Sequence, residues 1–176
     1  MAQANARHQV IAAAAGVALA VIGLSAQPAQ KPLPRFEDYR VDDAFKGSPA
    51  AVVTEGSKLA RMYRTRLREG AAKGPNFAGH FTLVSWGCGA ACQDWAVVDA
   101  RTGQVSESMI RTSVGAEFRP DSRLLLVDTP KRAAEVFGGK VPPKCSDCGT
   151  PGAYEWRDGT WQAAAGFGTS HVHRFE

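Results

Sequence analysis

The chain has 176 residues, of which 21 are Lys or Arg, 17 are Asp or Glu and four are Cys, and its formal net charge is +4. So small a net charge does not indicate nucleic acid or an anionic membrane surface as a partner. A chain of this length can bury its own hydrophobic core, and it fits one domain of ordinary size.

Residues 1–26 have the pattern of a secretory signal peptide. Arg7 lies in a polar start, residues 10–24 are all Ala, Val, Ile, Leu or Gly, and small residues precede Pro28. The apolar run is shorter than the ~20 residues of a usual membrane span. We therefore expect cleavage after Ala26 and no membrane span after cleavage. The alternatives are cleavage after Ser25 or Ala29, and an uncleaved anchor. The mature chain then has 20 basic and 17 acidic residues, a net charge of +3, and is periplasmic or secreted.

Composition divides the mature chain into two parts. Residues 27–34 are rich in Pro and Gln, which is typical of a flexible segment. We expect residues 27–56 to form a flexible lead and entry segment, and residues 57–176 to form one globular disulfide-bearing domain.

One amphipathic helix is predicted over Ser57–Glu69, capped by Ser57 and ended by Gly70. At 100° per residue its apolar arc contains Leu59, Met62, Tyr63 and Leu67, opposite a solvated basic face. Arg66 falls inside the apolar arc. Because a buried unpaired charge is costly, we expect Arg66 to pair with Asp94, Asp99 or Asp128.

The remaining segments predict short strands joined by tight turns, with a second short helix over residues 131–137. Three hairpins are expected, with turns at residues 100–103, 120–122 and 158–159. This pattern favours an α+β fold, in which one helix packs on an antiparallel meander sheet of about five to seven strands. The alternatives are an all-β barrel and a partial propeller-like sheet.

The four cysteines of an exported chain predict two disulfides. We favour the local pairs, Cys88 with Cys92 and Cys145 with Cys148, over the two other pairings. The same cysteines could in principle hold zinc, which export to an oxidising compartment makes a poor fit. His171 and His173 lie on one face of an extended segment, but no third ligand is evident, so we expect no metal and no cofactor.

The segment from Trp86 to Trp95 is the densest group of glycine, aromatic and polar residues. A disulfide between Cys88 and Cys92 would form a rigid loop that presents Trp86, Gln93 and Asp94 to a ligand. The leading hypothesis is therefore a non-catalytic binding module of the cell envelope. Its partner would be an envelope protein, a cell-wall component or a foreign enzyme that it inhibits.

Two enzymatic hypotheses remain as alternatives, besides an envelope structural protein whose loop only packs. His80 could serve as the base for a Cys88 nucleophile, oriented by Asp94 or Asp99, as in a Cys-His hydrolase. The C-x-x-C pair of Cys145 and Cys148 could serve a thiol-disulfide oxidoreductase. Against these, a Cys88 bonded to Cys92 is no nucleophile, and prolines and glycines around Cys145 leave no room for a helix.

Several short motifs resemble a family of uncharacterised bacterial exported proteins. They are the Gly-Pro-Asn-Phe-Ala-Gly-His segment 74–80, the Trp-Gly-Cys-Gly segment 86–89 with Cys92, Asp99 with Thr102-Gly103, and the Asp-Ser-Arg-Leu-Leu segment 121–125. The resemblance covers roughly residues 57–128. It implies export and a common fold, and it names no activity.

Overall fold

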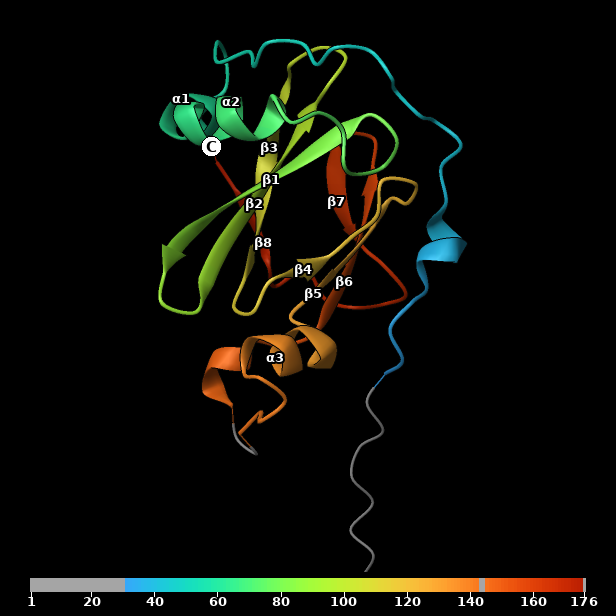
Figure 1. The fold of residues 1–176 in the computed structure, drawn as a ribbon, viewed down its shortest axis with the longest axis vertical. Coiled ribbons are helices and arrows are strands. Elements are labelled where there is room, and N and C mark those ends of the chain that lie inside the picture. The colour runs from blue at the N-terminus through green and yellow to red at the C-terminus, as the bar shows by residue number, and fades with distance from the viewer. Residues whose placement is uncertain (1–30, 143–144, 176) are drawn as a thin grey trace, which may run out of the picture. The chain divides into compact units, whose positions relative to one another are not determined.

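Eight strands form two antiparallel sheets in the computed structural model, which describes residues 31–142 and 145–175 (Figure 1). The first sheet has the order β1-β2-β3-β8 and the second has the order β4-β5-β6-β7. The strands of the first sheet are β1 (Phe81–Gly89), β2 (Cys92–Asp99), β3 (Val105–Thr112) and β8 (Val172–Arg174). Those of the second are β4 (Ala116–Glu117), β5 (Leu124–Val127), β6 (Gly152–Arg157) and β7 (Thr160–Ala163).

The α+β class and the antiparallel pairing predicted from the sequence are confirmed, but the single meander of five to seven strands is wrong. After β3 the chain leaves the first sheet and builds a second one from β4 to β7, and β8 then returns to pair with β3. Within the described residues the two sheets do not close into a barrel.

The main core lies between the two sheets. It combines Leu83, Val97 and Ile110 of the first sheet with Tyr154 and other large side chains of the second. On the opposite face of β1, Val84 and Trp86 pack into a second core with residues of the helices. Residues 82–84 and Trp86 of β1 are thus buried on both faces of the strand, which explains why apolar residues occur in both of its alternating sets.

The helical segment differs from its prediction in one respect. Ser57 accepts a hydrogen bond from the backbone of Ala60 at 3.1 Å, as expected of a cap. However, the helix is interrupted at Tyr63, which separates α1 (Lys58–Met62) from α2 (Arg64–Ala71). The expected apolar arc is therefore incomplete, and Met62 is 56 % exposed. The second predicted helix is confirmed as α3 (Pro130–Val136), with Thr129 as its cap.

The segment before the helices packs against the domain. Residues Leu33, Phe36 and Tyr39, which include the short 3-10 helix η1 (Phe36–Tyr39), cover a small core on the second sheet. The backbone of Val41 then bonds to Asp121, and that of Val53 bonds to Gly103, each at 2.9 Å. The compact unit that contains both sheets begins at Pro32, and residues 27–30 of the expected lead lie outside the described residues, with the predicted signal peptide.

The turn from residue 74 to residue 80 fixes the start of β1. Asn76 receives a hydrogen bond from the backbone N–H of Leu83 at 2.7 Å and donates to its carbonyl at 3.1 Å. Phe77 is fully buried and forms an isolated bridge with Phe81. The side-chain amide and this bridge take the place of a neighbouring strand, and they hold His80 at the sheet edge.

No helix among the described residues is long and apolar enough to cross a membrane.

Candidate functional site

The predicted ligand segment, Trp86 to Trp95, belongs to the β1–β2 hairpin, whose tip (residues 87–92) is closed by a disulfide between Cys88 and Cys92. Its exposed residues are glycine, alanine and cystine, which offer few polar groups to a ligand. Trp86 is only 9 % exposed, with its ring centroid 4.5 Å from that of Tyr63. Gln93 is partly buried. The loop is closed as predicted, but it does not present Trp86 to solvent.

Asp94 is buried because it pairs with Arg111 of the neighbouring strand. Its two carboxylate oxygens accept from Nε and Nη2 of Arg111 at 2.8 and 3.1 Å. The hydrogen bond to Asp94 raises the pKa of Arg111 above its ordinary value. Asp94 thus has a partner within the first sheet, and we assign it a structural role.

The prediction that Arg66 forms an ion pair is wrong. Arg66 is exposed on α2, and none of the ion pairs among the described residues includes it. The interruption at Tyr63 changes the helical phase on which the prediction depended, so that α2 buries Leu67 and Ala71 instead.

The structure contradicts the Cys88–His80 hydrolase. Cys88 is bonded to Cys92, and at 3.3 Å per residue it lies about 26 Å along β1 from His80. Asp94 and Asp99, the carboxylates expected to orient His80, contact Arg111 and the backbone of Arg101 instead.

The partner of His80 is Asp43, from the segment expected to be a flexible lead. Nδ1 of His80 lies 2.5 Å from Oδ2 of Asp43, and Nη2 of Arg101 donates to Oδ1 of Asp43 at 2.6 Å. Gly79, with φ +83°, allows this approach, because a Cβ there would lie 2.1 Å from the backbone oxygen of Asp43. The carboxylate is therefore shared between an imidazole and a guanidinium.

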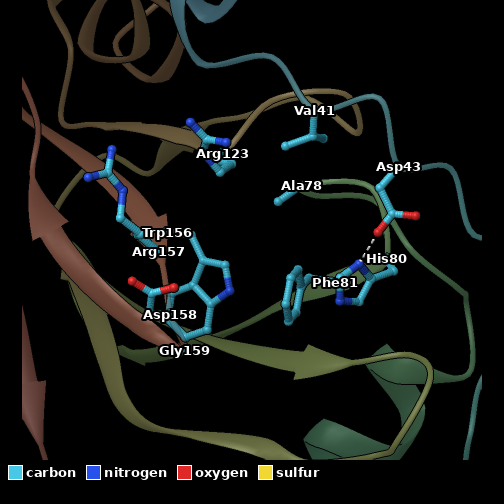
Figure 2. Close-up of a pocket in the computed structure, with 10 residues that line it drawn as sticks. All are labelled: Val41, Asp43, Ala78, His80, Phe81, Arg123, Trp156, Arg157, Asp158 and Gly159. Carbon is cyan, nitrogen blue, oxygen red and sulfur yellow. Dashed lines mark hydrogen bonds and ion pairs between the residues drawn. The ribbon is translucent and has the colours of Figure 1, made fainter.

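His80 and Asp43 line a cleft of about 510 Å³ (Figure 2). Three segments distant in the sequence build it: the chain before α1, the start of β1, and the β6–β7 hairpin, with Arg123 completing the wall. Such a volume is within the range of small-molecule sites. The residues that line the cleft are Val41, Asp43, Ala78, His80, Phe81, Arg123, Trp156, Arg157, Asp158 and Gly159.

One wall of the cleft is aromatic. Phe81 and Trp156 meet edge to face with ring centroids 5.8 Å apart. The indole N–H of Trp156 is buried without a hydrogen-bond partner among the described residues, and in Figure 2 its nitrogen is turned toward Phe81. Trp86 and Trp161 also have unpartnered indole N–H groups, but neither of them lines this cleft.

Two arginines of the cleft share one carboxylate. Arg123 donates through Nε to Glu155 at 3.0 Å, and Arg157 donates through Nη2 to the same side chain at 2.9 and 2.8 Å. These contacts leave both terminal NH₂ groups of Arg123 without a described partner. The cleft therefore combines an aromatic wall with unused hydrogen-bond donors.

The second disulfide joins Cys145 and Cys148, as predicted. Cys145 is followed directly by the three-residue 3-10 helix η2 (Ser146–Cys148). The first thiol of a thioredoxin-like site is activated by the start of a longer helix, which this segment does not form. With all four sulfurs paired, the cysteines do not fit a zinc site.

Of the two histidines near the end of the chain, His171 has side-chain partners within the chain. Nδ1 of His171 lies 2.7 Å from the hydroxyl of Tyr154, and Nε2 lies 3.6 Å from a carboxylate oxygen of Asp128. Burial raises the pKa of Tyr154. His173 lies in β8 opposite Met109. Among the described residues, the one geometric cluster of potential metal ligands is Cys88, Cys92 and Asp94, whose sulfurs are bonded to each other.

Comparison with known proteins finds no matching family model, curated protein or solved structure. The family resemblance of the motifs in residues 74–125 therefore stays a prediction. Of the cleft residues, sequence reasoning identified only His80. Asp43 and Trp156 were missed because they come from segments 37 and 76 residues away, whose approach only the fold reveals. The sequence offers one indirect indication of Asp43: an imidazole such as that of His80, next to Gly79, is expected to have a hydrogen-bond partner.

Proposed function

We propose that this protein is a non-catalytic binding module that takes a small ligand, or one side chain of a larger partner, into the cleft beside His80. The observation that carries the proposal is a cleft with an aromatic wall, bordered by hydrogen-bond donors that the chain itself does not satisfy. Ligand sites commonly combine an apolar lining with a few placed polar groups. This proposal keeps the binding role predicted from the sequence and moves it from the hairpin tip to the cleft.

A cleft-filling substitution tests the proposal. Wild-type protein, Val41→Trp and the control Val136→Trp are screened by calorimetry against small aromatic acids, amides, amines and saccharides. Val41 lines the cleft, whereas Val136 is 54 % exposed on α3. We expect at least one class to bind wild type and Val136→Trp, and to lose at least tenfold in affinity for Val41→Trp. Absence of binding by every class, or equal binding by all three proteins, would contradict the proposal.

The Asp43–His80 pair favours a second candidate, a hydrolase in which His80 activates water directly. An imidazole held by a carboxylate is the usual arrangement of a general base. No Ser, Thr or Cys lines the described cleft, so water would be the nucleophile. Hydrolysis of p-nitrophenyl acetate by wild type, lost in His80→Asn and retained in His173→Asn, would support this candidate. Equal rates for wild type and His80→Asn would reject it.

We also propose that the protein acts outside the cytoplasm, in the periplasm or secreted. Two formed disulfides support this location, because such bonds persist in oxidising compartments. Intact-mass measurement of the protein from its native cells, before and after reduction, tests the proposal. We expect loss of residues 1–26 and a gain of two hydrogens for each disulfide on reduction. A full-length chain with open thiols would contradict it.

A further inference from the structure

We infer that the ligand of the cleft is a monocarboxylate with an apolar, ring-sized body. This inference rests on the proposed function and specifies its ligand class. The body would occupy the space beside Val41, Ala78, Phe81 and Trp156, and the carboxylate would face the donors of Arg123 and Trp156.

The apolar body follows from the lining. Four of the cleft residues are apolar or aromatic, namely Val41, Ala78, Phe81 and Trp156. Ala78 and Trp156 are each only 4 % exposed, so the accessible apolar surface comes mainly from Val41 and Phe81. Phe81 is only partly buried, so part of its surface remains available to a ligand. Burying that surface under an apolar group is favourable by roughly 25 cal/mol per Å².

The carboxylate follows from the polar atoms that remain unused. The indole N–H of Trp156 has no acceptor, and the hydrogen bonds of Arg123 involve only Nε. A guanidinium with both NH₂ groups available matches the two oxygens of a carboxylate. A buried N–H without an acceptor is costly. Because Nε1 of Trp156 is covered and Phe81 packs against its ring, the carboxylate reaches this N–H only when the contact between Phe81 and Trp156 opens.

The two acidic residues of the cleft do not make a cation the better ligand. Asp43 already accepts from His80 and Arg101, so its charge is compensated. Asp158 is exposed at the β6–β7 turn, where water solvates it. The lining residues include two Arg and two Asp, so their net charge does not determine whether the ligand is an anion or a cation. The unpaired donors of the cleft determine it instead.

Three probes of one shape test the inference by calorimetry on the oxidised full chain: phenylacetate, phenylacetamide and phenethylamine. We expect phenylacetate to bind at least tenfold more tightly than the amide or the amine, since charge-assisted hydrogen bonds to the guanidinium are lost with the amide. Tighter or equal binding of the amide or the amine would overturn the carboxylate while leaving the binding cleft in place. Absence of binding by all three probes would also overturn the carboxylate inference. In that case the saccharides of the calorimetry screen described above test whether the cleft binds any ligand.

Two matched pairs of variants locate the contact. Trp156→Phe and Trp161→Phe each remove a buried unpartnered N–H from the same aromatic cluster, but only Trp156 lines the cleft. Arg123→Lys and Arg111→Lys each alter an arginine that pairs with a buried carboxylate. We expect phenylacetate affinity to fall at least fivefold in Trp156→Phe and Arg123→Lys only. Equal losses within each pair would show a general structural effect and overturn the inference. Thermal melting of all four variants confirms that they fold.

Discussion

The hairpin tip and the cleft differ in how far the chain satisfies its own polar groups. Next to the tip, the carboxylate of Asp94 is buried and held by two hydrogen bonds from Arg111, and the disulfide closes the turn. In the cleft, Arg123 keeps unused donors and Trp156 has an N–H without an acceptor. A dense motif in the sequence can therefore be a structural device, while groups available to a ligand come together from distant segments.

The largest contrast is expected between two arginine truncations. Arg111→Ala leaves the buried carboxylate of Asp94 without its partner, which should cost about 3 kcal/mol of unfolding free energy. Arg123→Ala should cost about 1 kcal/mol or less, because Glu155 retains Arg157. Urea unfolding of both variants measures the difference. If Arg123→Ala destabilises more than Arg111→Ala, the roles of the two regions are assigned the wrong way round.

The contrast also explains which features the sequence could predict. Strands, turns, both disulfides and the caps at Ser57 and Thr129 depend on neighbouring residues, and they follow from local patterns. The second sheet, the contact of Asp43 with His80 and the burial of Trp86 depend on residues far apart in the chain. The alternating residues of β1 place apolar side chains on both faces of the strand, but this pattern does not show which partner covers each face.

The hairpin disulfide is the next test of the comparison. Replacing both Cys88 and Cys92 by Ser removes the constraint on a loop of five residues, for which chain entropy predicts a loss of about 2 kcal/mol. Because the hairpin tip does not line the cleft, ligand affinity should stay within twofold of wild type. Chemical unfolding and calorimetry measure the two quantities. A tenfold loss of affinity in the folded variant would return the binding site to the hairpin tip.

A smaller loss of stability is expected where the cleft wall is tightest. Gly79→Ala places a Cβ against the backbone of Asp43 at a positive φ, which should cost about 1–2 kcal/mol and separate Asp43 from His80. The ring-nitrogen resonances of His80 report on that contact by NMR. Gly87→Ala is the control, since a Cβ there has open space around it and should change stability little. Unchanged His80 resonances in Gly79→Ala would show that the wall yields without moving Asp43.

The central claim is that ligands enter the cleft beside His80 and not the hairpin tip. The most direct test is a ¹H–¹⁵N titration with phenylacetate that follows the indole N–H signals of the four tryptophans. The account predicts a saturable shift of the Trp156 signal, with the Trp86 and Trp95 signals almost unchanged. A shift centred on Trp86, with Trp156 unaffected, would contradict it.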